Sequence, residues 1–377
     1  MGGTEYDCEI LYDNRRIRIL GLIGLKDFRM VRIFDQGRIL SIRNIVILLI
    51  LPILLILLPG CGSRKSQSYS QFQISGFAQG TSYQISYYAG DAIISSKSID
   101  QKFTELDSSL SIYKPYSLIN QFNNSEKGIE MDEHLYKVVQ RSLKIWKESD
   151  GVFDISILPI VEAWGFGMKR HSNQPSDEVI NKALACSGSD KLHIRGRQLV
   201  KDIPCLRIDV NGIAQGYSVD VIADYIESQG VQNYLIEIGG EIRVKGRKQP
   251  GNQNMRIGIE QPSNDKDEEA VIKKIIEMKG GAITTSGNYR KYIQNGSKKL
   301  SHLMDPKTGR PIENEMISVT VRTANAMSAD GYDNVLIGKD LGKAFAFLKK
   351  HKGLEAYFIY QDKNGTVRDT ASAGFFK

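Results

Sequence analysis

Residues 207–220, RIDVNGIAQGYSVD, carry the pattern that decides the fold class. The segment predicts a strand that ends near Val210, then a glycine turn, then a helix that starts around Gln215. A strand, turn and helix in this order present backbone amides and a helix N-terminus to an anion, and Asp209 adds a carboxylate at the rim. The alternative is a plain connection with a close-packing glycine, which the spacing alone favours.

Helical and strand patterns continue on both sides of this segment. Alternating apolar residues in 72–88 predict two strands, and helical spacing in 94–110 predicts a helix. A second helix is expected from an N-cap at Asp132 to a stop at Gly151, and the helix of the opening segment should run to Gly230. Later residues predict strands at 233–238, 241–246, 255–260 and 316–323, and helices near 328–337 and 340–351.

These elements predict an α+β fold. Strands outnumber strand-helix-strand units, so mixed or antiparallel sheets flanked by helices are expected. No Pro/Ser-rich linker or repeat interrupts residues 72–371, which indicates one integrated domain over 72–377. The chain has 377 residues, 41% of them hydrophobic, and a net charge of +7. That charge is too small and too scattered for a nucleic-acid-binding protein.

The first 61 residues have the features of an export signal. An uncharged apolar run at 45–58 follows Arg38 and Arg43, and it is shorter than the about 20 residues of a spanning helix. Gly60 precedes Cys61, so the segment resembles a bacterial lipoprotein signal in which Cys61 is lipidated. The alternative is an uncleaved anchor helix. Either way we expect an exported protein tethered to a membrane, facing the periplasm and held at the inner membrane, with residues 62–71 as a polar tether.

The two cysteines of the folded part are Cys186 and Cys205. In an exported protein they could form a disulfide, and two separate half-buried thiols are the equal alternative.

Three further polar stretches suit a phosphate-bearing ligand. Gly239 and Gly240 form a second glycine turn, which Glu241 follows, and residues 284–287 set hydroxyls at the end of a strand. Asp330 and Asn334 share one helix face, where hard oxygens suit Mg²⁺. Each stretch also has an ordinary structural reading, as a turn, a polar loop, or an N-cap at Asp330.

The order of these stretches resembles that of the FAD:protein FMN transferase family, known as ApbE, over about residues 74 to 350. The resemblance is carried by GTSYQI (80–85), DSSLSIYKPYSLINQFN (107–123), GVFDISILPIVEAWGFG (151–167), IDVNGIAQGYSVD (208–220), YLIEIGGEIRVKG (234–246), AITTSGNYRKY (282–292), SHLMDPKTGRPI (301–312), ISVTV (317–321) and AMSADGYDNVLIG (326–338).

The resemblance implies an enzyme that cleaves FAD with Mg²⁺ and joins FMN, through a phosphoester, to a threonine or serine of an exported electron-transfer protein, releasing AMP. It also implies an α+β fold with the flavin nucleotide in a cleft. Two alternatives use the same residues: a hydrolase that yields FMN and AMP, and a lipoprotein that only binds flavin.

The resemblance also assigns residues to the cofactor. Tyr113 stands where an aromatic residue lies near the flavin, and Asp209 where an acid contacts the nucleotide. Gln215 replaces the usual lysine, and Gln79 replaces the common methionine. The remaining implied cofactor contacts are Val152, Phe153, Asp154 and Met304.

For the metal, the resemblance implies a backbone carbonyl at Gly212, the carboxylate of Asp330, and Asp333 through its main chain. Asn334 replaces a threonine that supplies a hydroxyl in the family. An amide oxygen is also a hard ligand, so metal binding is expected to survive, with altered affinity.

His302 is the candidate catalytic residue, because the stiff turn around Asp305-Pro306 and Gly309-Arg310-Pro311 can hold it at the cleft. Its ring could take the proton of the acceptor hydroxyl or stabilise departing AMP. The alternative is a histidine that satisfies backbone groups within the turn.

Overall fold

The computed structural model describes residues 69–377 except 168–173, 263–270, 289–291, 296–297 and 302. Cys61 and the predicted export signal therefore lie outside the described residues, as does His302. Residues Ser66–Lys377 form one compact unit. Within the described ranges, no helix has both the length and the apolar character needed to cross a bilayer.

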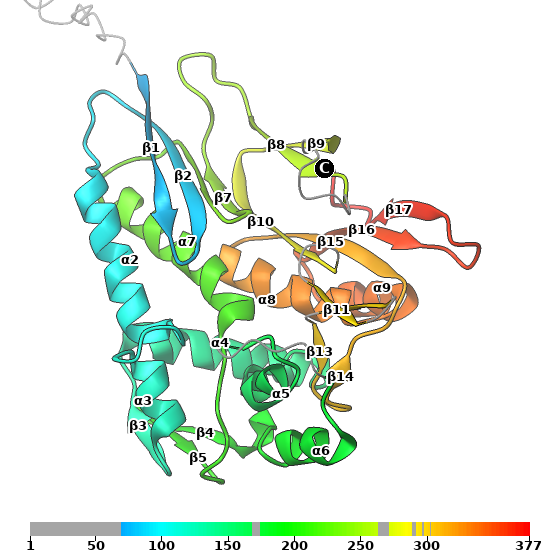
Figure 1. Cartoon of the computed structure of the whole chain (residues 1–377). Helices are drawn as coiled ribbons and strands as arrows, with labels where there is room; N and C mark the ends of the chain where they lie inside the picture. Colours follow the sequence, from blue (N-terminus) through cyan, green and yellow to red (C-terminus); the bar gives the residue numbers. More distant parts are fainter. Residues whose placement is uncertain (1–68, 168–173, 263–270, 289–291, 296–297, 302) are drawn as a thin grey trace, which may run out of the picture. The chain divides into compact units, whose positions relative to one another are not determined.

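An antiparallel sheet of eight strands forms the centre of the unit (Figure 1), in the order β1-β2-β6-β7-β10-β15-β16-β17. Its strands are β1 (Ser70–Ala78), β2 (Thr81–Ala89), β6 (Tyr234–Ile238), β7 (Glu241–Lys245), β10 (Gly280–Gly287), β15 (Met316–Thr323), β16 (Glu355–Gln361) and β17 (Val367–Ala371). Every neighbouring pair in it is antiparallel.

In the part of the chain that the structure describes, four smaller sheets are also antiparallel. They are formed by β3 (Gly128–Glu130), β4 (Leu192–Arg195) and β5 (Gln198–Lys201); by β8 (Met255–Glu260) and β9 (Ile272–Met278); by β11 (Tyr292–Asn295) and β12 (Lys298–Ser301); and by β13 (Met304–Asp305) and β14 (Arg310–Pro311).

The helices are α2 (Ser96–Leu110), α3 (Leu118–Asn124), α4 (Glu133–Ser149), α5 (Leu158–Ala163), α6 (Asp177–Ala185), α7 (Asn211–Ser228), α8 (Ala326–Ile337) and α9 (Leu341–Lys350). Short 3-10 helices occupy Ile155–Ile157 and Ser189–Lys191. The α+β prediction is confirmed, and so are the predicted strands of residues 72–88, 233–238, 241–246, 255–260 and 316–323.

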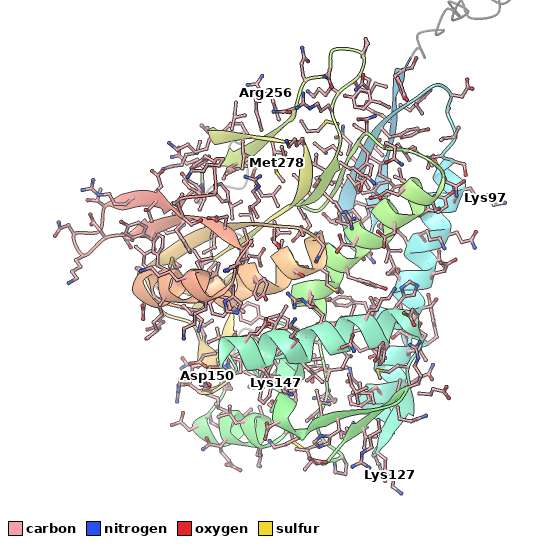
Figure 2. All side chains as sticks on the ribbon, turned by 180° about the vertical axis from the view of Figure 1, so that it is seen from behind. Lys97, Lys127, Lys147, Asp150, Arg256 and Met278 are labelled. Carbon is pink, nitrogen blue, oxygen red and sulfur yellow. A yellow bond between two sulfur atoms is a disulfide. The ribbon has the colours of Figure 1, made fainter. Side chains whose placement is uncertain are left out.

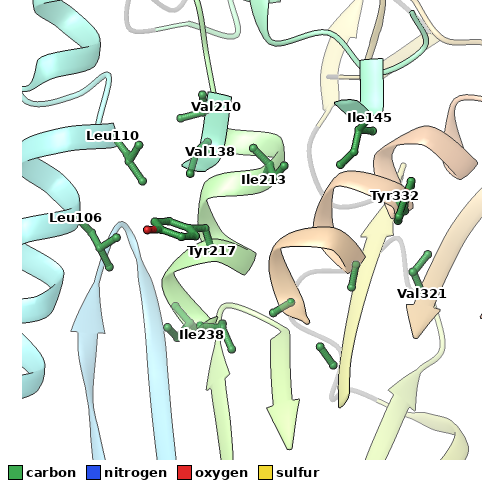
Figure 3. Packing of buried hydrophobic residues seen from close by; sticks show 14 of the residues in the cluster. Leu106, Leu110, Val138, Ile145, Val210, Ile213, Tyr217, Ile238, Val321 and Tyr332 are labelled. Carbon is green, nitrogen blue, oxygen red and sulfur yellow. The ribbon is translucent and has the colours of Figure 1, made fainter. Parts of the chain in front are cut away.

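Alternating side chains of the central sheet enter two apolar layers. Tyr234, Ile236 and Ile238 of β6 belong to the larger core, which also includes residues of α2, α4, α7 and α8. Figure 3 shows part of this core, with Tyr217 of α7 directed toward Leu106 of α2. The other face of the sheet packs against the β8-β9 hairpin, in a cluster that includes Met278 (Figure 2).

The helix of the opening segment begins earlier than predicted. No strand is formed before Val210, and α7 starts at Asn211 with both Gly212 and Gly216 inside it. The Asp209 carboxylate accepts a hydrogen bond from the Asn211 N–H at 2.8 Å, which helps the chain to enter the helix there. The prediction of a turn at Gly212, before a helix starting around Gln215, was therefore wrong.

The predicted helix from Asp132 to Gly151 is confirmed with its caps. The Asp132 carboxylate accepts the Leu135 N–H at 2.8 Å, and Asp150 ends α4 in the left-handed conformation. Cys186 and Cys205, for which the sequence left two possibilities, form a disulfide in the structure.

Candidate functional site

Helices α7 and α8 approach each other closely at Gly216. A Cβ atom at this position would lie 2.3 Å from the backbone oxygen of Ala326, so only glycine fits. The Gly216 N–H donates to the Asp330 carboxylate at 2.8 Å. Asp330 is 4% exposed, and it is not the N-cap of its helix, because Asn325 caps α8. The contact brings two motifs that are far apart in the sequence into one site.

Three oxygen atoms converge on the side-chain nitrogen of Asn334. Nδ2 of Asn334 lies 3.2 Å from the Gly212 carbonyl oxygen, 3.0 Å from the Asp330 carbonyl oxygen and 3.0 Å from Oδ1 of Asp333. The four positions that the resemblance assigned to the metal are thus brought together. Asp333 contributes its carboxylate here, whereas a main-chain contact was expected.

The converging oxygens are of the type that Mg²⁺ prefers. Carbonyl and carboxylate oxygens are hard ligands, and magnesium sites usually combine one or two carboxylates with other oxygen donors. Within the described ranges, no group of three or more His, Cys, Asp or Glu side chains is arranged to hold a metal. The carbonyl and carboxylate oxygens at Gly212, Asp330 and Asp333 are of a type that fits magnesium, once the Asn334 amide has turned away from them.

Buried carboxyl groups surround this oxygen cluster. Burial raises the pKa of Asp330 to about 7, with a further contribution from Asp220. The pKa of Asp333 is raised well above its usual range by burial and by Asp330, although Thr284 donates a hydrogen bond to its carboxylate at 2.7 Å. A bound cation would favour the ionised forms of these carboxyls.

Glu241 is a site residue that the sequence analysis noticed and did not assign. Burial and Asp330 raise its pKa well above the usual range. Gln215 donates from Nε2 to Oε2 of Glu241 at 3.0 Å and to the Ile238 carbonyl at 2.8 Å. Gly239, with φ +59°, permits this approach, since a Cβ there would lie 2.1 Å from Gln215 Nε2. The acid directly after the glycine turn was the available signal.

The Phe153 ring lies beside the oxygen cluster, whereas the Asp154 carboxylate forms its hydrogen bonds elsewhere. A Cβ atom at Gly212 would lie 3.5 Å from the Phe153 ring, so the ring covers the start of α7. The Asp154 carboxylate accepts hydrogen bonds from the hydroxyl and N–H groups of both Ser156 and Ser189. It therefore joins two segments of the chain. Val152 packs against Gly338, where a Cβ would meet its side chain at 2.7 Å.

The other predicted cofactor residues lie on separate elements. Gln79, with φ 51°, is in the β1-β2 turn and hydrogen-bonds to Asp107. The Tyr113 side chain is 60% exposed. Met304 is 6% exposed and packs in the small cluster that includes Trp164 and Ile180.

The turn after His302 is anchored to α5. The Trp164 indole N–H donates to the Gly309 carbonyl at 2.7 Å, and the Gly309 N–H donates to the Asp305 carbonyl at 2.8 Å. These bonds fix the Asp305-Gly309 turn, as the prolines and glycine predicted.

Comparison with known proteins identifies relatives over most of the chain. The ApbE family model matches residues 79–358. The chain is 38% identical to an FAD:protein FMN transferase of Vibrio cholerae serotype O1 over 301 residues, which is 78% of this chain and 88% of that protein. It is 33% identical to an FAD:protein FMN transferase of Escherichia coli K12 over 317 residues, covering 80% and 89% of the two chains.

Solved structures agree with these relatives. The flavin transferase ApbE from Vibrio cholerae superposes with a TM-score of 0.73 at 37% identity, covering 81% of this chain and 98% of that chain. The apo form of the flavinyl transferase ApbE from Pseudomonas stutzeri gives a TM-score of 0.73 at 32% identity, covering 81% and 96%.

Proposed function

Because the chain belongs to the ApbE family, we propose that it is an FAD:protein FMN transferase. The observation that carries this function is the convergence of Gly212, Asp330 and Asp333 oxygens beside the α7-α8 contact. In the proposed reaction an acceptor threonine or serine oxygen bonds to the FMN phosphorus. The bridging P–O bond to AMP breaks, AMP leaves with the bridging oxygen, and the hydroxyl proton passes to a base.

The oxygen cluster is the proposed magnesium site. The ion would be held by the Gly212 carbonyl, the Asp330 main chain or carboxylate, the Asp333 carboxylate and the Asn334 amide oxygen. When bound, it would neutralise negative charge on the pyrophosphate of FAD. The Gly216 N–H keeps the Asp330 carboxylate oriented at 2.8 Å. The Phe153 ring lies 3.5 Å from the Cβ position of Gly212 and would exclude water on that side of the cluster.

The remaining roles follow the family pattern. His302 would accept the hydroxyl proton or stabilise departing AMP, and the Asp305-Gly309 turn would limit its freedom. Tyr113 would stack on the flavin ring, since its side chain is 60% exposed. Gln79, Val152, Asp154, Asp209, Gln215 and Met304 complete the proposed FAD contacts.

The proposed acceptor is an exported, flavin-carrying subunit of a membrane redox complex. Lipidation of Cys61 would hold the enzyme at the periplasmic face of the inner membrane, close to such subunits. Replacing Cys61 by alanine should move the protein from the membrane fraction to the soluble fraction. Retention of the variant in the membrane would contradict the lipid anchor.

The proposed roles are tested by incubating variants with FAD, Mg²⁺ and the acceptor and measuring covalent flavin fluorescence in a denaturing gel. Asp330→Ala is expected to lose transfer together with Mg²⁺ binding, while the exposed control Asp91→Ala keeps both. His302→Ala is expected to keep FAD binding and lose transfer, with His193→Ala as control. Normal labelling by Asp330→Ala or His302→Ala would refute the role of that residue. AMP and free FMN without labelling would indicate hydrolysis, and intact FAD would indicate a protein that only binds flavin.

A further inference from the structure

A cavity of about 580 Å³ lies at the N-terminal end of α8, apart from the oxygen cluster. Ser328 and Tyr332 line it, and they share one face of α8 because they are one helical turn apart. Asp330 and Asn334 lie on the opposite face of the helix. None of the residues proposed to contact FAD or magnesium lines this cavity.

Positive charge dominates the lining of the cavity. Arg141 comes from α4, whereas Lys350 ends α9 and His351 and Lys352 follow it. No Asp or Glu among the described residues lines the cavity. Lys350 and Lys352 are exposed, and neither forms an ion pair with a carboxylate of the described ranges. The positive charge of Lys350 also stabilises the C-terminal end of α9 through the helix dipole. That role does not account for the charges of Lys352 and Arg141, which lie outside α9.

Arg141 and His351 are positioned without any carboxylate partner in the described part of the chain. The Arg141 guanidinium lies over the Tyr332 ring, 5.0 Å from its centroid, and its Nε is buried without a hydrogen-bond partner. His351 contacts the Phe347 carbonyl oxygen through Nδ1 at 2.8 Å, which leaves Nε2 available. Its ring stacks on Phe347, with centroids 4.0 Å apart.

Two acids contact residues at or beside the cavity lining and have partners there. Asp220 binds Arg243 at 2.7 Å and accepts the N–H groups of Ala326 and Met327 at the start of α8. Glu148 accepts the Tyr332 hydroxyl at 2.6 Å. The lining itself includes Arg141, Lys350 and Lys352, and no Asp or Glu of the described residues, so its net charge is positive.

We propose that this cavity binds an organic phosphate at a second ligand site, separate from the flavin site. Its volume lies within the range of about 300–1,000 Å³ that small-molecule sites occupy. Arg141, Lys350 and Lys352 can donate charge-assisted hydrogen bonds to phosphate oxygens. Asn325 can add its amide N–H groups, because its side-chain oxygen already accepts the Ser328 N–H at 2.9 Å.

A phosphate of this kind could be a free metabolite or a lipid headgroup, and glycerol phosphate is common to both. The test compares the full chain with Lys350→Glu/Lys352→Glu and with the control Lys97→Glu/Lys127→Glu, which changes net charge equally. Lys97 and Lys127 project from the periphery of the molecule (Figure 2). All four lysines are exposed, so neither double variant should unfold; near-ultraviolet circular dichroism checks this.

Binding is measured by calorimetry with glycerol phosphate, and by sedimentation with phosphatidylglycerol vesicles. Relative to the control, Lys350→Glu/Lys352→Glu is expected to lose at least about tenfold in affinity. If Lys350→Glu/Lys352→Glu loses affinity for free glycerol phosphate, the ligand is a soluble organic phosphate. If it loses affinity only for the vesicles, the ligand is a lipid headgroup. Equal binding by both double variants in both assays, or no saturable binding by the unmodified chain, overturns the proposal. FMN transfer should be unchanged in both variants, so this test is independent of the proposed enzyme activity.

Discussion

Replacing Asn334 by threonine is expected to tighten Mg²⁺ binding and to destabilise the metal-free protein. The Asn334 amide nitrogen lies 3.0 to 3.2 Å from the Gly212, Asp330 and Asp333 oxygens, at the point on which the proposed metal ligands converge. A cation reaches these oxygens only after the NH₂ group has turned away. Asparagine therefore competes with the ion for the same acceptors.

The size of both effects follows from the hydrogen bonds. An NH₂ group has two hydrogens, so it satisfies two of the three oxygens at a time. At about 1 kcal/mol net for each bond, displacement costs about 2 kcal/mol, or about 30-fold in Kd. Threonine has no NH₂ group and offers a hydroxyl oxygen to the metal. We expect Mg²⁺ to bind about 10- to 30-fold more tightly, and the free energy of unfolding without metal to fall by about 1–3 kcal/mol.

The assay is calorimetric titration with Mg²⁺, paired with urea unfolding in the presence of a chelator. The matched control is Asn124→Thr, at the exposed end of α3, which should change neither quantity. Equal or weaker Mg²⁺ affinity in Asn334→Thr, compared with the unmodified chain, would refute the competition between the amide and the ion.

Three further predictions concern stability. Without added metal, the free energy of unfolding should fall as pH rises from about 4 to about 7. The reason is that the pKa of Asp330 is about 7 in the folded chain against 3.8 in the unfolded chain, so the folded state keeps its proton to higher pH. Chemical unfolding across this range should show a shallower fall for Asp330→Asn than for the unmodified chain, and equal slopes for the two proteins would contradict the raised pKa of Asp330. Gly216→Ala should lower the free energy of unfolding by about 2 kcal/mol, because the clash with the Ala326 oxygen costs about 3 kcal/mol and the higher helix propensity of alanine restores about 1 kcal/mol. Thermal unfolding measures this change, and an unchanged Tm would argue against the close α7-α8 contact. Cys186→Ser should lower the free energy of unfolding by about 3 kcal/mol, because the disulfide closes a loop with a sequence separation of 19. Denaturation of the unmodified chain with and without reductant tests this prediction. A stability that does not depend on reductant would show that the disulfide is absent in solution.

Much of the fold could be predicted from the sequence because its signals are local. Asp132 caps α4 by accepting the Leu135 N–H, and alternation in β6 matches the alternating burial of Tyr234, Ile236 and Ile238. The start of α7 could not be predicted locally. Gly212 suggests a turn, yet it lies inside α7, and the close contact of Gly216 with Ala326 comes from another part of the chain.

The residues of the candidate site could be predicted only through the family resemblance, for the same reason. Spacing placed Asp330 and Asn334 on one helix face, but it could not bring Gly212 to them, since that contact joins α7 to α8. Glu241 was missed as a site residue because its half-buried position against Gln215 arises only when the Gly239 turn packs against α7. In both cases the missing information was tertiary.

The central claim is that the chain transfers FMN to a protein hydroxyl. The most direct test incubates the chain with FAD, Mg²⁺ and an exported flavin-carrying acceptor, then measures the intact mass of the acceptor and the amount of AMP. The account predicts one FMN in phosphoester linkage to a threonine or serine for each AMP released. AMP release together with free FMN and an acceptor of unchanged mass would contradict it.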